Sequence, residues 1–396
     1  MRMTPRGIGL LLAAAAMIGG GFAFGYAELT MIGTTAVVAL GFALIYVAWR
    51  PDLCVVRRAD PDRVMRGQDS RVTLTVSNAS RLRAATLIAH DRCGRETIPV
   101  PLLRLRAGKK TTVEYPVGTQ RRGVVEIGPL RVVRRDPLGL VTMPRSHGDT
   151  DRVWVYPKVY PLAAVPPGVT RSLDGLIDRV PHGTITFDTL REYVIGDELR
   201  RVHWRTTARV GKLMVREHLD TSLPRLVLLL DDRALVYPDA RAATAETFES
   251  ACEAAASIIL AAARTELPVV LQLVSGPTAR SSGRDRDTRP ALDLLAEAGL
   301  TRPAQAKAGL VGPDPFQDAI GRLRARRLGD TLIYLTGPGR AEDLSPVSAL
   351  RGTYPTIVIA ALGAAEPQPA LVEGVLILSA ADGETFAAAW DGVPTW

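Results

Sequence analysis

The chain has 396 residues, a formal net charge of +8 and three cysteines. It is too long for one small core, because domains usually contain about 100 to 200 residues. Cys54, Cys93 and Cys252 lie too far apart for a disulfide framework or a zinc-type spacing, which fits a reducing compartment. The basic residues are scattered among acidic ones without a recognised nucleic-acid motif, so we expect no nucleic-acid partner.

The first predicted elements are two membrane-spanning helices, over Ile8–Phe24 and Leu29–Trp49. Between Ile8 and Trp49 only Glu28 carries a charge at neutral pH. Each apolar run has about 20 residues, the length that crosses a hydrocarbon core of about 30 Å as a helix. A helix also satisfies its own backbone hydrogen bonds in lipid. Residues 1–51 are therefore predicted to form a transmembrane hairpin.

Arginines flank this hairpin on both sides, and its turn has no lysine or arginine. The positive-inside rule then places both ends, and the soluble region, on the cytoplasmic side of the cell membrane. The alternative is a cleaved signal peptide ending near Gly25–Ala27. In that case the second span would run from outside to inside, so the soluble region is again cytoplasmic. Near the membrane we expect about 1 kcal/mol of attraction to anionic lipid from each of four arginines, namely Arg57, Arg58, Arg63 and Arg66.

Residues 52–161 show the period-two pattern of strands with one buried face. Val72, Leu74 and Val76 alternate with threonines, and turn sequences separate several such runs. An antiparallel β-sandwich of immunoglobulin-like type is predicted. His90, Asp91 and His147 are the residues that could suggest a reaction there, and we expect none of them to be catalytic.

Residues 162–222 contain the densest polar segment, Phe187 to Glu217. Three interpretations remain open for it. Asp197 and His203 could form an acid–base pair, arginines and carboxylates could form a structural network, or the segment could dock a protein partner through its arginine, tryptophan and tyrosine side chains. The last two interpretations rest on Arg191, Glu192, Tyr193, Gly196, Asp197, Arg200, His203, Trp204 and Arg209.

Two motifs in this chain resemble a bacterial family, domain-of-unknown-function family fifty-eight. One runs from Arg121-Arg122-Gly123 through Ile127-Gly128-Pro129-Leu130 to Arg134-Arg135-Asp136-Pro137-Leu138-Gly139-Leu140. The other runs from Leu190-Arg191-Glu192-Tyr193 through Gly196-Asp197 and His203-Trp204 to Arg216-Glu217. The resemblance implies a membrane-tethered protein with a von Willebrand factor A-like domain. It also implies a MoxR-type AAA+ ATPase as partner, and it leaves the activity undefined.

Residues 223–396 are predicted to form that domain, an α/β fold with a doubly wound parallel sheet. The apolar run Arg225–Asp232 has the character of a buried parallel strand. Strand and helix patterns then alternate to the last helix, Thr385–Trp390. The polar stretches Ser275–Thr288 and Gly299–Pro315 are predicted to be loops.

No metal site is expected at the end of the first strand of this domain. The resembled domains that bind magnesium use Asp-x-Ser-x-Ser there, because hard cations need carboxylate and hydroxyl oxygens. This chain has Asp231, but Arg233 and Leu235 replace the two hydroxyls. After the strand Leu332–Leu335, the segment 336–339 supplies no carboxylate either.

These observations favour a membrane-anchored, non-enzymatic adaptor without a cofactor or catalytic residues, which presents cytoplasmic domains to a protein partner. The expected partner is a MoxR-type AAA+ ATPase. Two alternatives remain. One is an enzyme that acts at the membrane through Asp197 and His203, and the other is a metal-dependent ligand-binding domain. The oligomeric state is left open.

Overall fold

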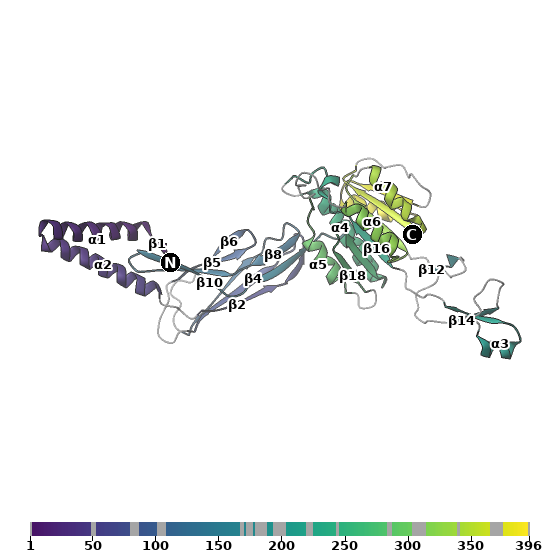
Figure 1. Ribbon diagram of the computed structural model, residues 1–396. Helices are drawn as coiled ribbons and strands as arrows, with labels where there is room; N and C mark the ends of the chain where they lie inside the picture. Colours follow the sequence, from purple (N-terminus) through teal and green to yellow (C-terminus); the bar gives the residue numbers. More distant parts are fainter. Residues whose placement is uncertain are drawn as a thin grey trace. The chain divides into compact units, whose positions relative to one another are not determined.

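The computed structural model is a mixed α/β chain with two apolar N-terminal helices and several sheets (Figure 1). It divides into two compact units, Met1–Tyr156 and Pro157–Trp396, which we describe separately. The residues that the structure describes are 2–48, 53–79, 87–100, 108–166, 170–171, 177–178, 188–192, 203–218, 225–242, 245–282, 287–302, 314–338, 341–364 and 375–394.

The first unit begins with α1 (Pro5–Phe24) and α2 (Ala27–Ala48), close to the predicted spans. Both helices are long and apolar enough to cross a membrane, judged by length and composition. The Thr4 hydroxyl caps the start of α1 by accepting from the Gly7 amide at 3.2 Å. Gly25 ends α1 with φ +73°, a left-handed conformation that glycine adopts without strain.

Glycines allow α1 and α2 to pack closely. A Cβ atom on Gly33 would lie 2.5 Å from Ile18 Cγ1 and 3.1 Å from the Ala14 carbonyl oxygen. A Cβ atom on Gly21 would lie 2.3 Å from Thr30 Oγ1. Small residues at such points bring two backbones together, which is the usual way apolar helices associate in lipid.

The rest of the first unit is a β-sandwich, which the sequence predicted. One sheet has the order β2-β4-β7, and the other has the order β1-β10-β9-β5-β8-β11-β3 with β6 beside β5. Valine and leucine side chains of both sheets share one buried core, together with Tyr115. The strands are β1 (Arg2–Met3), β2 (Leu53–Asp60), β3 (Arg63–Met65), β4 (Arg71–Asn78), β5 (Leu87–Cys93), β6 (Glu96–Val100), β7 (Lys110–Pro116), β8 (Gly123–Ile127), β9 (Leu130–Arg135), β10 (Val141–His147) and β11 (Asp151–Tyr156).

Two features of the sandwich differ from the prediction. The pairing is not purely antiparallel, because β3 runs parallel to β11. The unit also ends at Tyr156 and not at Pro161. The residues that follow belong to the second unit, where the Tyr160 amide donates to Ser257 Oγ at 2.9 Å and the Trp390 indole N–H donates to the Ala164 carbonyl at 2.8 Å.

The second unit contains a six-stranded sheet in the order β18-β17-β16-β19-β20-β21. All neighbouring strands are parallel except β18, which is antiparallel to β17. The strands are β16 (Leu226–Leu230), β17 (Val269–Leu273), β18 (Thr278–Ser281), β19 (Thr331–Thr336), β20 (Thr356–Leu362) and β21 (Val375–Ala380). β18 forms within the predicted loop Ser275–Thr288, so that part of the prediction was wrong.

Helices follow most of the parallel strands and bury the apolar side chains of the sheet. Side chains from α6 and α7 pack with Val227, Leu229 and Tyr334 in one core cluster, while α4 contacts β16, β19, α5 and α8. The helices are α4 (Glu246–Arg264), α5 (Arg289–Glu297), α6 (Pro315–Ala325), α7 (Ala341–Ser348) and α8 (Gly383–Asp391), with short 3₁₀ turns at Ala234–Val236 and Ala349–Gly352.

Smaller elements precede this sheet. They are the strand pairs β12 (Thr170–Arg171) with β13 (Ile177–Asp178) and β14 (Asp188–Glu192) with β15 (Met214–His218), and the helix α3 (Trp204–Val210).

Candidate functional site

The strand order predicts a ligand site at the carboxyl ends of β16 and β19. The chain leaves β16 toward β17 on one side and later returns to β19 on the other, so the connections diverge between these two strands. Ligands of open α/β sheets bind at such a switch point. Asp231, Asp232 and Arg233 follow β16 directly, and Thr336 ends β19.

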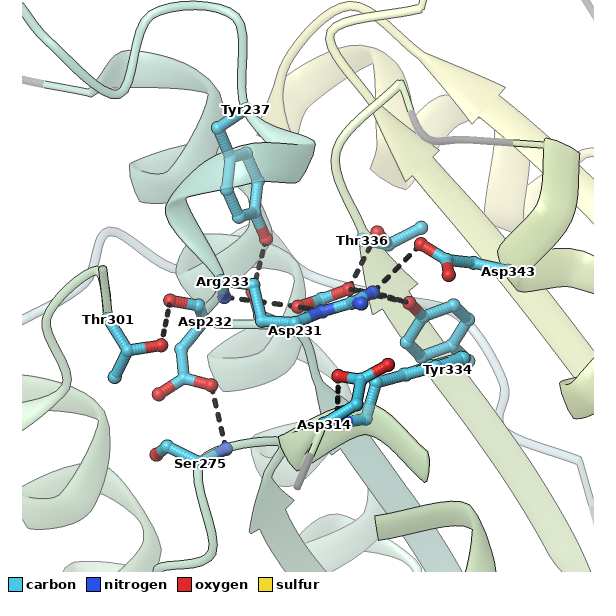
Figure 2. Close-up of polar contacts among 11 residues, drawn as sticks. Asp231, Asp232, Arg233, Tyr237, Ser275, Thr301, Asp314, Tyr334, Thr336 and Asp343 are labelled. Carbon is cyan, nitrogen blue, oxygen red and sulfur yellow. Dashed lines mark hydrogen bonds and ion pairs between the residues drawn. The ribbon is translucent and has the colours of Figure 1, made fainter. Parts of the chain in front are cut away.

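Arg233 forms a bidentate ion pair with Asp231 at this point (Figure 2). Its Nη2 lies 2.7 Å from Asp231 Oδ2, and its Nε lies 3.0 Å from Oδ1. The Arg233 amide also donates to Oδ1 at 3.1 Å. Asp231 is fully buried and Arg233 is 6% exposed. The planar fork of the guanidinium thus occupies both oxygens of the carboxylate.

Hydroxyl groups complete the surroundings of Asp231. Tyr334 Oη donates to Oδ2 at 2.6 Å, and Thr336 Oγ1 lies 3.3 Å from the same oxygen. Tyr237 Oη donates to the main-chain carbonyl of Asp231 at 2.5 Å. These partners come from β19 and from the turn after β16, so the network joins the two strands on either side of the switch point (Figure 2).

A second carboxylate reaches Arg233 from α7. Asp343 Oδ2 lies 2.9 Å from Arg233 Nη2, and its side chain is 16% exposed. The guanidinium also lies over the Phe316 ring of α6, with 4.2 Å between Cζ and the ring centroid. Arg233 therefore links β16 with α6 and α7 through one side chain.

The arginine and the two tyrosines of this network hold their protons firmly. Burial alone would lower the pKa of Arg233, but the hydrogen bonds and charge of Asp231 outweigh it and raise that pKa. Burial, with the nearby negative charge of Asp231, raises the pKa of both Tyr237 and Tyr334 well above the usual value. The arginine remains a cation and both tyrosines keep their protons.

Asp232 holds the neighbouring loops. Its Oδ1 accepts from the Ser275 amide at 2.9 Å, and its carbonyl accepts from the Thr301 amide at 2.7 Å and from the Thr301 hydroxyl at 3.0 Å. Burial raises the pKa of Asp232, while the hydrogen bonds from Ser275 oppose that shift. These contacts position the chain after β17 and after α5 beside the switch point.

The site has the chemistry of a closed structural network. Its main carboxylate has a guanidinium on both oxygens, so a divalent cation would have to displace Arg233 before it could bind. Leu235, at the position of the second replaced hydroxyl, is 50% exposed. The sequence singled out Asp231 and Arg233 but missed Asp343, Tyr334 and Tyr237. Asp343 was missed because a carboxylate was expected directly after the strand, at residues 336–339, and this one lies on the following helix.

The polar segment that the sequence singled out is only partly described. Arg191 and Glu192 end β14, which pairs with β15. His203, Trp204 and Arg209 lie at or in α3. The other predicted residues, Tyr193, Gly196, Asp197 and Arg200, lie outside the described residues. The pairing of Asp197 with His203 therefore stays a prediction.

His203 caps α3. Its Nδ1 lies 2.7 Å from Thr206 Oγ1 and accepts from the Thr206 amide at 3.3 Å, and its own amide donates to the Met214 carbonyl at 2.7 Å. Gly211 ends the helix with φ +73°. One ring nitrogen of His203 is thus used to start the helix, and the main-chain amide of the same residue attaches the helix to β15.

α3 presents an exposed surface of apolar and basic side chains. Trp204 is 65% exposed, and Val210 and Leu213 are also exposed. Arg205 and Arg209 are exposed on the same short helix. We call these five residues the α3 surface. Aromatic and arginine side chains are the usual anchors of protein interfaces, so its composition fits docking.

A second buried ion pair lies in the sandwich. Arg57 of β2 forms a bidentate pair with Asp91 of β5, at 2.8 Å from Nη2 to Oδ1 and 3.1 Å from Nε to Oδ2. Tyr115 Oη donates to Asp91 at 2.5 Å, and the Arg57 side chain is 3% exposed. The expected attraction of Arg57 to lipid is therefore wrong, because its charge is turned into the sandwich to join the two sheets.

The chain is thus one of the mixed α/β proteins with an N-terminal apolar helix pair. Residues 189–327 match the family described as "Protein of unknown function DUF58". The matched segment runs from β14 through α3 and the switch point to the end of α6, and it supports the family resemblance. A search of curated proteins found no match.

Solved structures show only weak likeness. The CARDB domain of the PF1109 protein from Pyrococcus furiosus is 17% identical, with 26% of this chain and 88% of that chain covered and a TM-score of 0.21. The putative ApaA protein from Bordetella pertussis is 14% identical, with 27% and 94% covered and a TM-score of 0.19. The β-glucosidase EmGH1 from Erythrobacter marinus is 13% identical, with 24% and 15% covered and a TM-score of 0.16. At these scores the likeness carries no functional argument.

Proposed function

We propose that this chain is a membrane-anchored, non-enzymatic adaptor that presents its cytoplasmic domains to a protein partner. The observation that carries the proposal is the α3 surface, where an exposed tryptophan stands among arginines within the segment matched by the family model. Large apolar side chains at the surface usually mark an interaction site when they are grouped.

The proposal places α1 and α2 across the cell membrane as a multi-pass anchor. Their length and composition support this, and so do the arginines that precede α1 and follow α2. With both ends of the hairpin on the cytoplasmic side, the sandwich and the second unit, which we call the α/β unit, lie in the cytoplasm.

We further propose that the α/β unit is a von Willebrand factor A-like domain and that the partner is a MoxR-type AAA+ ATPase. The sheet order β18-β17-β16-β19-β20-β21, with one antiparallel edge strand, supports the first point. The family resemblance, which implies such an ATPase as partner, supports the second point. The segment that matches the family model contains the α3 surface.

The contacts favour an adaptor over the two alternatives. A metal-dependent domain needs a carboxylate with vacant oxygens, and Arg233 occupies those of Asp231. An enzyme that uses His203 would have to work through Nε2, because Nδ1 is engaged with Thr206 as the cap of α3. Both contacts stabilise local structure.

The test is copurification of the detergent-solubilised full chain with MoxR-type ATPases from the same genome, with and without nucleotide. Trp204→Ala should weaken the association by about tenfold or more, since a central tryptophan often contributes over about 1.4 kcal/mol to binding. Arg209→Glu should weaken it as well, whereas the matched change Arg324→Glu, on the exposed side of α6, should not. No association under either nucleotide condition would contradict the proposal.

A further inference from the structure

The turn between β9 and β10 is held in one conformation by hydrogen bonds to a buried carboxylate. The Asp136 carboxylate, which is buried, accepts from the Leu138 amide at 3.0 Å and from the Val141 amide at 2.7 Å. Gly139 has φ +70°, and its amide donates to the Asp136 carbonyl at 3.0 Å. Asp136-Pro137-Leu138-Gly139-Leu140 thus has one fixed shape, and we call it the Asp136 turn.

The Asp136 turn is fastened to the start of α1. The Thr4 hydroxyl donates to the Gly139 carbonyl at 2.7 Å, and the Thr4 amide donates to the Leu140 carbonyl at 2.9 Å. Gly7 lies so close that a Cβ atom there would be 2.2 Å from the Leu140 oxygen. The turn and the first residues of α1 therefore form one rigid piece.

The end of α2 lies against the same hairpin of strands. Leu140 and Val141 share a buried cluster with Leu40, Ala43 and Val47. Further along, the Arg134 guanidinium lies over the Tyr46 ring at 4.6 Å, and Arg145 donates to the Ala48 carbonyl at 3.4 Å. Both helices of the hairpin are thus attached to β9 and β10.

These contacts give the turn a definite depth, on the proposed function's premise that the hairpin spans the membrane. The 20 residues of α1 extend about 30 Å at 1.5 Å each, which matches the hydrocarbon core. Residues 4–7 then lie at the cytoplasmic interface. The Asp136 turn, which bonds to Thr4, lies at the same level.

Leu138 is the residue that this arrangement exposes. It is 55% exposed, although Leu140, two residues further on, is 6% exposed. Arg2 and Arg6 are exposed beside the start of α1. An apolar side chain flanked by basic ones is the pattern that binds a bilayer interface, with apolar groups among the acyl chains and cations at the phosphates.

We infer that the Asp136 turn is a third membrane contact, in which Leu138 inserts into the lipid interface and Arg2 and Arg6 bind anionic headgroups. The sandwich is then held at the bilayer surface by α1, α2 and this turn together. This membrane contact also assigns a role to the Asp-Pro-Leu-Gly-Leu motif, which is not part of the α3 surface.

The experiment uses the full chain in vesicles of phosphatidylcholine and phosphatidylglycerol that contain spin-labelled lipids. Cys54 is exposed and is changed to serine, while Cys93 and Cys252 are buried and stay in place. A polarity-sensitive fluorophore is attached in turn to Leu138→Cys, to Thr150→Cys and to Val38→Cys. Thr150 is exposed in the loop between β10 and β11, beyond the other end of β10, and serves as the matched control. Val38, 70% exposed on α2, reports insertion of the hairpin.

The expected result is blue-shifted emission and strong quenching at Leu138 by lipids labelled near the headgroup, with neither effect at Thr150. Adding Arg2→Gln and Arg6→Gln should reduce quenching at Leu138 in vesicles with phosphatidylglycerol. Quenching at Val38 with water-like, unquenched emission at Leu138 would overturn this inference and leave the anchor intact. Unquenched emission at Val38 would overturn the anchor and the inference with it.

Discussion

Replacement of the Arg233 guanidinium tests the interpretation of the switch point as a closed network. Arg233→Met keeps most of the volume of the arginine stem but removes the charge and the fork. Asp231 would then be a fully buried carboxylate without its cation, with Tyr334 as its nearest hydrogen-bond donor at 2.6 Å. The stacking on Phe316 would also be lost.

The expected cost is large for one substitution. Breaking a buried ion pair on one side costs about 3–5 kcal/mol, because the remaining charge is not compensated. The lost stacking on Phe316 adds about 1 kcal/mol. Changing both partners, with Asp231→Asn and Arg233→Met, should recover most of this loss, since the fully buried position then holds no charge and Asp343, whose side chain is 16% exposed, is reached by water.

Hydrogen–deuterium exchange of the full chain is the assay, because it reports each strand separately in a protein of two units. In Arg233→Met, a cost of about 3–5 kcal/mol should speed exchange of the β16 and β19 amides by about a hundredfold or more. In the double variant, the exchange rates of these amides should be close to those of the unaltered protein. The coupling energy between the two substitutions should therefore exceed about 2 kcal/mol. Unchanged exchange in Arg233→Met, or additive effects in the double variant, would refute this view.

Other expected outcomes concern the sandwich, the hairpin and α8. Asp91→Ala should cost about 3–5 kcal/mol by leaving a buried guanidinium unpaired, seen as faster amide exchange in β2 and β5. Gly33→Leu should cost about 1–3 kcal/mol through overpacking between the two helices, and SDS titration followed by circular dichroism should show it; Gly41→Leu, which faces open space, should not. Asp382→Ala should cost about 1 kcal/mol by removing the cap of α8. Hydrogen bonds from Thr385 lower the pKa of Asp382, so this stabilisation is complete above the usual value of 3.8 and is lost as the pH falls through the lower folded-state pKa; Asp382→Asn should keep the cap and remove the pH dependence.

Local patterns predicted much of the fold. The two apolar runs predicted the two helices to within a few residues of their bounds, because the length and the apolar composition of each run are local properties of the sequence. Alternating residues in the sandwich and unbroken apolar runs such as that of β16 predicted strands, because each pattern follows from burial of one face or of both. Arg233 was placed beside Asp231 because only one residue, Asp232, separates them.

Long-range contacts could not be predicted in this way. Arg57 and Asp91 lie on strands of different sheets, and no pattern within either strand reveals the other. Asp343 reaches the switch point from a helix whose short sequence, with Pro346 inside it, carries no strong periodic signal. β18 has four residues and pairs only at the sheet edge, so its sequence resembles that of a loop.

Arg233 has a consequence for how this domain can be controlled. A cation that is part of the polypeptide is present in each copy from the moment of folding, and a chelator cannot extract it. Its occupancy does not follow the concentration of any ion in the cell. A change at the switch point would therefore have to come from mechanical displacement of α7, which carries Asp343, or from a partner that competes for that carboxylate.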